Sequence, residues 1–278
     1  MIAAIGELVL DVTVLPGGGL RAGDDQDALI RMGGGGQAAN FCAWAASLGE
    51  PVRLLTRVGE DQAGRLLVAE LERSGVEVCG VQGREPTGIV VVLVGPDGER
   101  TFARQRGASM GLRGEDLKEA WMHGVRLLHV PAYALFREPL ASAARLAVGL
   151  ARQAQALLSV DLSSAAGLRE YGAERMAANL GELRPDLLFA TEPELAELGR
   201  SSGRLAKLVV VKLGRNGCRV LGRRVPAALV DEVDATGAGD AFAAAFCAAY
   251  LEGSTPLEAA GRAVLVAGRA VSRLGARP

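Results

Sequence analysis

The chain has 278 residues, of which 49% are hydrophobic and 23% are charged, and its formal net charge at pH 7 is −1. This length and composition are typical of one large globular domain, or of one domain with a small appendage. The near-zero charge gives no general attraction to nucleic acid or to an anionic membrane surface. An anionic ligand must therefore be held by a local site.

The N-terminal segment and the cysteines indicate the cellular compartment of the protein. The start of the chain lacks a basic region, and Glu7 and Asp11 interrupt its apolar run, which disfavours a signal peptide. The apolar stretch 241–251 is too short to span a bilayer. Cys42 and Cys247 lie in Ala-rich apolar segments, where buried free thiols are expected. We therefore expect a cytoplasmic protein with no membrane or nucleic-acid partner.

Runs rich in Val, Ile and Leu alternate with longer segments of helical periodicity. In chain order we expect a strand at 3–12, a helix at 36–49, a strand at 52–59, a helix at 63–75, a strand at 125–132, a helix at 139–155, a strand at 156–163, a helix at 172–184, strands at 186–191 and 207–214, and helices at 238–252 and 255–272. This alternation predicts the α/β class, with a mostly parallel central sheet and helices on both faces.

Two segments depart from this alternation. Residues 10–32 are expected to be extended chain with turns, and residues 87–106 a hairpin around the sequence Pro96-Asp97-Gly98. Strand-like insertions of this kind in an α/β chain predict a small sheet outside the main body.

The sequence DATGAGDAF contains a glycine-rich turn directly before an apolar helix. Gly237 and Gly239 bracket Ala238, so backbone N–H groups can turn toward a ligand, and the helix start adds partial positive charge. The turn is suited to a phosphate, although glycines before a helix are more often a plain tight turn. It is not a P-loop, because no GxxxxGK[ST] motif occurs in the chain.

Asp240 follows this turn and admits two interpretations. As a residue of the first helical turn, it can simply complement the helix dipole. However, a carboxylate beside a phosphate-binding turn repels the ligand. Its presence is explained if it removes a proton from a hydroxyl group that attacks a bound phosphoryl group. The turn would then stabilise the charge of the transferred group.

The segment VDATGAGDAF (233–242) resembles the C-terminal signature of the PfkB/ribokinase family of carbohydrate kinases, and GGQAAN (35–40) resembles its N-terminal signature. Similar family segments lie at 58–78, 86–101, 209–218 and 270–276, so the resemblance covers nearly the whole chain. It implies a Rossmann-like ribokinase fold in a single kinase domain (1–278), with a β-lid formed by about 12–30 and 87–106. It also implies transfer of the γ-phosphoryl group of ATP, with Asp240 as catalytic base and Gly237, Ala238 and Gly239 as the anion hole.

On the sugar side, the resemblance implies substrate contacts from Gly35, Gly36, Asn40 and Asp240. Asp11, at the end of the expected strand, matches a family aspartate that binds substrate hydroxyls. Val9 stands where ribokinases proper have an asparagine, so fructokinase-like or 2-keto-3-deoxygluconate kinase-like members are favoured over ribose. The same members favour Arg106 as a substrate residue. Two further residues were weighed: Tyr133 can line the pocket or belong to the core, and His129 is expected in the core.

On the nucleotide side, the resemblance implies an ATP site at Lys212, Gly214 and Gly217. Glu194 is expected to act on Mg²⁺ through water, since this ion keeps several waters. The family asparagine that usually precedes it is replaced by Thr191.

The resemblance also leaves open a potassium site. Its residues would be Asp234, Thr236, Ala270, Arg273 and Gly275. A homodimer formed through the lid is a further implication, because the lid is often the dimer interface in related kinases.

Three other functions were weighed. A nucleoside kinase on the same fold is weakly disfavoured, because aromatic residues make up only 4% of the chain and base-stacking groups are scarce. An NAD-dependent dehydrogenase is disfavoured, because the glycines at 33–36 do not fit GxGxxG after a first strand. A non-catalytic sugar or nucleotide sensor is disfavoured by the retained Asp240 and its intact glycine turn.

Overall fold

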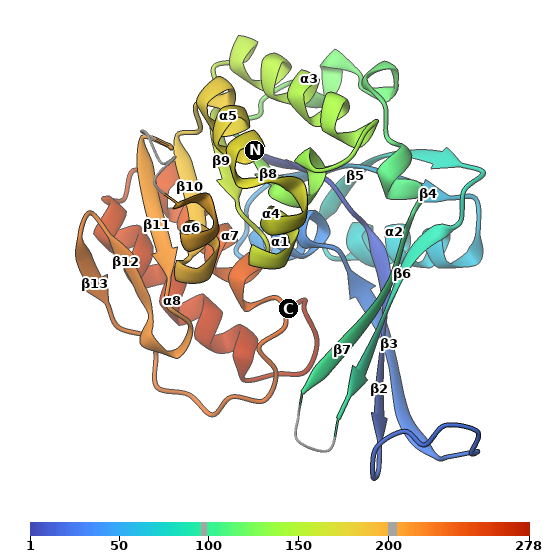
Figure 1. Cartoon of the computed structure of the whole chain (residues 1–278). Helices are drawn as coiled ribbons and strands as arrows, with labels where there is room; N and C mark the ends of the chain where they lie inside the picture. The colour runs from blue at the N-terminus through green and yellow to red at the C-terminus, as the bar shows by residue number, and fades with distance from the viewer. Residues whose placement is uncertain (96–98, 200–204) are drawn as a thin grey trace.

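A computed structural model describes residues 1–95, 99–199 and 205–278 (Figure 1). Its main body contains a nine-stranded sheet in the order β13-β12-β11-β10-β9-β8-β1-β4-β5. The strands are β1 (Ile2–Ile5), β4 (Val52–Gly59), β5 (Val76–Gly83), β8 (Leu127–Pro131), β9 (Leu157–Asp161), β10 (Leu187–Thr191), β11 (Leu208–Lys212), β12 (Cys218–Val220) and β13 (Arg223–Val225). The pairs from β11 to β5 are parallel, and only β12 and β13 are added antiparallel. The prediction of a mostly parallel sheet is confirmed.

Helices cover both faces of this sheet. They are α1 (Gln37–Ser47), α2 (Gln62–Arg73), α3 (Leu140–Gln153), α4 (Ala165–Tyr171), α5 (Ala173–Leu183), α6 (Glu192–Leu198), α7 (Ala238–Leu251) and α8 (Pro256–Val271). Because side chains alternate along a strand, Ile2 and Ala4 of β1 join one apolar cluster with α1, α7 and α8, while Ala3 and Ile5 join the other with α3 and α5.

Local sequence accounts for several helix ends. The N–H of Gly64 donates to the Asp61 carboxylate at 2.8 Å, which caps α2. Gly49 and Gly75 follow α1 and α2 with φ of +89° and +85°, the left-handed geometry that ends a helix. The expected helices therefore begin and end near the residues that their capping patterns indicate.

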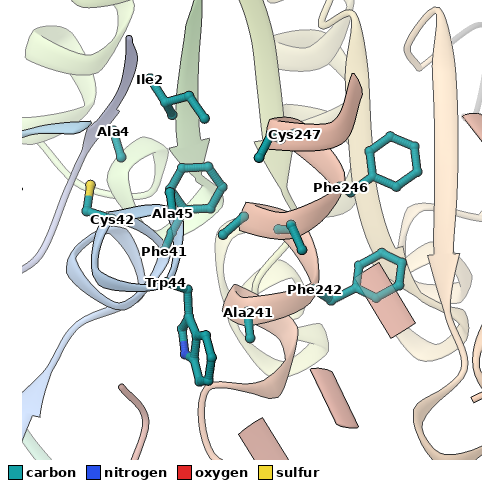
Figure 2. Close-up of a cluster of buried hydrophobic side chains, with 14 of the residues drawn as sticks. Ile2, Ala4, Phe41, Cys42, Trp44, Ala45, Ala241, Phe242, Phe246 and Cys247 are labelled. Carbon is teal, nitrogen blue, oxygen red and sulfur yellow. The ribbon is translucent and has the colours of Figure 1, made fainter. Parts of the chain in front are cut away.

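Helices α1 and α7 lie side by side in the core (Figure 2). Phe41 and Trp44 of α1 and Phe242 and Phe246 of α7 are all buried. The rings of Phe242 and Phe246 lie on the side of α7 away from α1, against Phe189 of β10, so they do not separate the two helices (Figure 2). This packing brings the two helix starts, 200 residues apart in the sequence, to the same edge of the sheet.

A second sheet of four strands projects from the body, in the order β3-β2-β6-β7 (Figure 1). Its strands are β2 (Val9–Pro16), β3 (Ala28–Gly35), β6 (Thr87–Val94) and β7 (Arg100–Gly107). β6 and β7 pair antiparallel, as the expected hairpin requires. The turn predicted at 96–98 lies outside the described residues.

The single strand predicted at 3–12 is wrong. The chain forms β1, breaks at Gly6, where φ is +155°, and enters β2 in the other sheet. Asp11 is therefore the third residue of β2 rather than the end of a strand. The error arises because β1 is buried on both faces and β2 only partly, so an apolar run passes through the break without a change in periodicity. The predicted elements also did not include β5, β12, β13, α4 and α6.

The four cysteines are free and buried, as expected for Cys42 and Cys247. No helix in the described part of the chain is long and apolar enough to cross a membrane.

Candidate active site

The starts of α1 and α7 meet at one hydrogen bond. Asn40 is the fourth residue of α1 and Asp240 the third of α7, and both side chains are buried. Asn40 Nδ2 donates to Asp240 Oδ2 at 3.1 Å. The structure thus brings together one residue from each of the two predicted signatures.

The carboxyl group of Asp240 lies in an environment that favours its neutral form. Burial raises its pKa to about 7; the nearby Asp161 adds to this rise, while hydrogen bonding by Asn40 and the charge of Lys212 oppose it. A carboxyl group with this pKa is divided between its acid and base forms near neutral pH, which suits a group that accepts and releases a proton.

The turn before α7 presents backbone N–H groups. Gly237 has φ of +75°, and a Cβ there would lie 2.3 Å from the carbonyl oxygen of Ala276, so only glycine fits. Within residues 1–95, 99–199 and 205–278, no protein acceptor is found for the N–H groups of Gly239 and Asp240. A Cβ placed on Gly239 would lie 3.4 Å from Lys212 Nζ. The turn therefore combines free donors with an adjacent cation.

Lys212 ends β11, and its cationic side chain is 14% exposed. Its Nζ lies 2.6 Å from Asp161 Oδ2, at the end of β9, and Asp161 is fully buried. Burial lowers the pKa of Lys212, but the charges of Asp161 and Glu194 outweigh burial and raise it. Sequence analysis missed Asp161. The available signal was an aspartate at the carboxyl end of a buried strand, the edge at which ligands bind in parallel sheets.

Glu194 and Thr191 form a reciprocal cap at the start of α6. The N–H of Thr191 donates to Glu194 Oε2 at 2.7 Å, and the N–H of Glu194 lies 3.4 Å from Thr191 Oγ1. Burial raises the pKa of Glu194. Thr191, in place of the family asparagine, is thus the N-cap of this helix.

A cavity of about 550 Å³ opens beside this cap. It is lined by Thr191, Glu192, Pro193, Lys212, Leu213, Gly214, Asn216, Arg219 and Arg224. Of the residues predicted to contact the nucleotide, Lys212 and Gly214 line the cavity. Gly217 shapes the hairpin to β12 instead: its φ is +87°, and a Cβ would lie 2.0 Å from Val225 O.

The predicted sugar-side residues also converge. A Cβ on Gly35 would lie 2.2 Å from the Asp11 carboxylate, and one on Gly36 would lie 2.3 Å from Glu7 O, so both glycines allow a close approach of the backbone. Burial raises the pKa of Asp11 to about 6, and the positive charge of Arg277 opposes this rise.

Arg106 lies at the mouth of a second, smaller cavity. Its NH1 atom is 2.5 Å from Glu7 Oε1, and its guanidinium lies 4.5 Å from the centre of the Tyr133 ring. The cavity, of about 130 Å³, is lined by Arg104, Arg106, Met110, Tyr133, Phe136, Arg137, Gly167, Glu170, Tyr171 and Arg175. Tyr133 thus lines a cavity. His129 is buried and stacks on Phe41 at 3.9 Å, as expected of a core residue.

The residues predicted for potassium lie at the entry to α7, in the last turn of α8 and directly after α8. Asp234 Oδ1 accepts hydrogen bonds from the N–H and the hydroxyl of Thr236 at 2.9 and 2.6 Å, and Oδ2 accepts from the N–H of Gly275 at 3.1 Å. The carbonyl of Ala270 accepts from the N–H of Arg273 at 3.4 Å. The two sides of the predicted site are therefore adjacent.

Arg277 is a site residue that sequence analysis missed. Its Nε donates to Asn40 Oδ1 at 3.2 Å, NH2 to the carbonyl of Gly35 at 2.9 Å, and NH1 to Glu70 Oε1 at 3.1 Å. Its side chain is only 8% exposed. An arginine next to the C-terminal residue is ordinarily expected at the surface, and no local pattern indicates otherwise.

Comparison with known proteins gives one consistent result. The model of the pfkB family of carbohydrate kinases matches residues 1–278. An ATP-dependent ribose-1-phosphate kinase from Halopiger xanaduensis is 34% identical over 80% of this chain and 74% of its own length. Fructokinase-1 from Oryza sativa subsp. japonica is 29% identical over 93% and 85%. A crystal structure of an E. coli protein in complex with ATP and Mg²⁺ is 25% identical, with a TM-score of 0.84, and the match covers 99% of this chain and 94% of that one.

Proposed function

Since the chain belongs to the pfkB family of carbohydrate kinases and is an ATP-dependent sugar kinase, we propose that Asp240 is the base that deprotonates the attacking sugar hydroxyl. The fold is the ribokinase-like α/β fold. The observation that supports the role of Asp240 is its position. A buried carboxyl group with a pKa of about 7 lies between the Asn40 amide and the free N–H groups of the α7 turn.

The chemistry follows from this arrangement. A sugar hydroxyl directed at Asp240 loses its proton to the carboxylate as its oxygen attacks the γ-phosphorus of ATP, and the bond from that phosphorus to the β–γ bridging oxygen breaks, which releases ADP. The N–H groups of Gly239 and Asp240, with Lys212, stabilise the negative charge on the transferred group. Gly237 and Ala238 hold the turn in the shape that directs these donors at one point.

On the nucleotide side, ATP occupies the 550 Å³ cavity beside Lys212 and Gly214, and Gly217 shapes the hairpin that leads from this cavity to β12. Glu194 would hold Mg²⁺ through one of its waters, and the ion would supply positive charge to balance that of ATP. The buried, capped position of Glu194 supports an indirect role, because one of its oxygens already accepts a hydrogen bond from Thr191.

On the sugar side, Asp11, Asn40 and the backbone at Gly35 and Gly36 bind hydroxyl groups, and Arg106 closes one end of the pocket. The smaller cavity is lined by Arg104, Arg106, Arg137 and Arg175 and by the carboxylate of Glu170, while Arg106 is also paired with Glu7. This excess of positive charge favours a sugar with an anionic group, such as a sugar acid or a sugar phosphate, over a neutral pentose.

The four-stranded sheet is proposed to act as a lid and as a dimer interface. Strand alternation and register place Asp11, Arg104 and Arg106 on one face. The other face presents an apolar patch of Val12, Val14, Ile30, Met32, Val91 and Leu93, in which Ile30 and Met32 are 59% and 73% exposed. A second copy of the chain would cover this patch. Sedimentation should show a dimer that Met32→Lys converts to monomer, with Leu146→Lys on α3 as control; a wild-type monomer contradicts the proposal.

Two further proposals concern conditions for activity. A potassium site that stabilises the α7 turn would be formed by Asp234, Thr236, Ala270, Arg273 and Gly275. Replacing potassium chloride by choline chloride should therefore lower the rate. The reaction is placed in the cytoplasm, which supplies ATP and keeps the four free thiols reduced. An unchanged rate without potassium would remove the first proposal.

The test of the proposed function is an ADP-release screen with an Asp240→Asn control. Fructose, 2-keto-3-deoxygluconate, ribose 1-phosphate and adenosine are compared on the wild-type protein. On the best substrate, Asp240→Asn should lower kcat by about 10²–10⁴, because the amide retains the shape but cannot accept the proton. A variant with more than about a tenth of wild-type kcat contradicts the base assignment. Activity on adenosine alone would favour the nucleoside kinase.

A further inference from the structure

We propose that Arg277, beside the C-terminal residue, is a positioning residue that fixes the Asn40 amide so that its NH2 group donates to Asp240. The inference rests on the proposed function in one respect, namely that Asp240 is the base. Its geometry is a chain of contacts from Glu70 through Arg277 and Asn40 to Asp240.

An asparagine amide can be placed in two orientations, which exchange its oxygen and nitrogen. In the observed one, Asn40 Oδ1 accepts from Arg277 Nε at 3.2 Å and Nδ2 donates to Asp240 Oδ2 at 3.1 Å. In the reverse orientation, the NH2 group would face the donor of Arg277 and the oxygen would face the carboxylate. Arginine has no acceptor, so both contacts would be lost together. The guanidinium therefore determines which group of Asn40 faces the base.

Arg277 is itself held firmly. Its NH1 pairs with Glu70 at 3.1 Å and its NH2 donates to Gly35 O at 2.9 Å. The guanidinium lies against the backbone at Gly34, where a Cβ would be 1.8 Å from NH1. The preceding residue is also held, because Trp44 Nε1 donates to Ala276 O at 2.9 Å. Ala276 and Arg277 thus lie between the starts of α1 and α7.

The consequence concerns the proton affinity of Asp240. The groups that face it are Asp161 from β9, Lys212 from β11, and Gln37 and Asn40 from α1, with the charge of Glu194 acting on Lys212. Of these, Asp161 raises the pKa of Asp240, while Lys212 and the two amides lower it. A hydrogen bond donated to a carboxylate stabilises its charged form. Releasing the Asn40 amide should therefore raise the pKa of Asp240.

The experiment is a ¹³C NMR titration of the Asp240 carboxyl group in the ligand-free protein, with Asp240→Asn to assign the signal. Arg277→Met and Arg277→Lys should each raise the midpoint by roughly 0.5–1 pH unit, the scale of a weakened charge-assisted hydrogen bond. Lysine retains the charge near Glu70 but lacks the Nε donor, so it separates amide orientation from loss of charge. Asn40→Ala should raise the midpoint as well, and Arg277→Lys in that background should add nothing.

Each outcome decides the inference. A midpoint within about 0.2 pH unit of wild type in folded Arg277→Lys overturns it, as does an equal shift from Arg277→Lys in the Asn40→Ala background. If Arg277→Met does not fold, Arg277→Lys provides the same test. If the midpoint shifts but the acid limb of the kcat profile does not move with it, the positioning role stands and the base assignment fails.

Discussion

Helices α1 and α7 both follow glycines at the same edge of the sheet, but the groups beside the two helix starts suit different ligands. Before α1, Gly35 and Gly36 bring the backbone close to the acceptor groups of Asp11 and Glu7. Before α7, the N–H groups of Gly239 and Asp240 have no protein acceptor among the described residues, and Gly239 lies beside the Lys212 cation. The first start suits the hydroxyl groups of a sugar, and the second suits a phosphate.

A glycine-rich helix start can therefore bind different ligands, and the side chains around it determine which ligand it binds. Helix dipole and free N–H groups are similar at both starts. The difference lies in side chains that come from other strands, a carboxylate from β2 at one start and a lysine from β11 at the other. The hydrogen bond between Asn40 and Asp240 joins the two, so hydroxyl and phosphate can meet at one carboxyl group.

The largest effect should come from obstructing the α7 start. Gly239→Val should lower kcat by about 10²–10³, comparable to the loss of one anion-hole donor, because its methyl groups would displace Lys212 from the turn. Gly239→Ala is the matched control: its Cβ would lie 3.4 Å from Lys212 Nζ, an ordinary contact, and much of the activity should remain. Steady-state kinetics measure kcat, and calorimetry measures sugar affinity. If sugar affinity falls as much as kcat, the two starts do not have separate ligands.

Changes at the α1 start should act on the sugar. Asn40→Ala and Asp11→Ala each leave a substrate hydroxyl unpaired in a buried site, at a cost of about 1–3 kcal/mol, which corresponds to roughly 5–150-fold weaker sugar binding. Binding of ATP, measured by calorimetry on the same folded variants, should change little. An increase confined to the KM for ATP would reverse the assignment of the two helix starts.

The smallest effect concerns the dependence of kcat on pH. Because burial raises the pKa of Asp240 to about 7, its base form is lost as the pH falls through that value. The rate of the wild-type protein should therefore be level above pH 8 and fall about tenfold per pH unit well below pH 7. The measurement is kcat against pH at saturating substrates. A rate that stays level down to pH 5 would show that Asp240 is ionised there, or that another group accepts the proton.

The sequence by itself determined what depends on local chemistry. The alternation of apolar runs indicated the α/β class, and the glycines at 237 and 239 with Asp240 predicted a phosphate-binding turn and a base. Gly237 illustrates why: a positive φ and a crowded Cβ position leave no alternative to glycine, so the residue type alone records the geometry.

Only the tertiary structure decided the contacts between distant segments. The break between β1 and β2 and the insertion of Arg277 between the helix starts have no local pattern. For Asp161, its place at the end of a strand indicates a ligand-binding edge but not its contact with Lys212. Arg277 lies 237 positions from Asn40, and each is an ordinary residue in its own segment. Their meeting depends on α1 and α7 packing together and on the chain after α8 returning to them. Long-range packing, and not periodicity, places these charges.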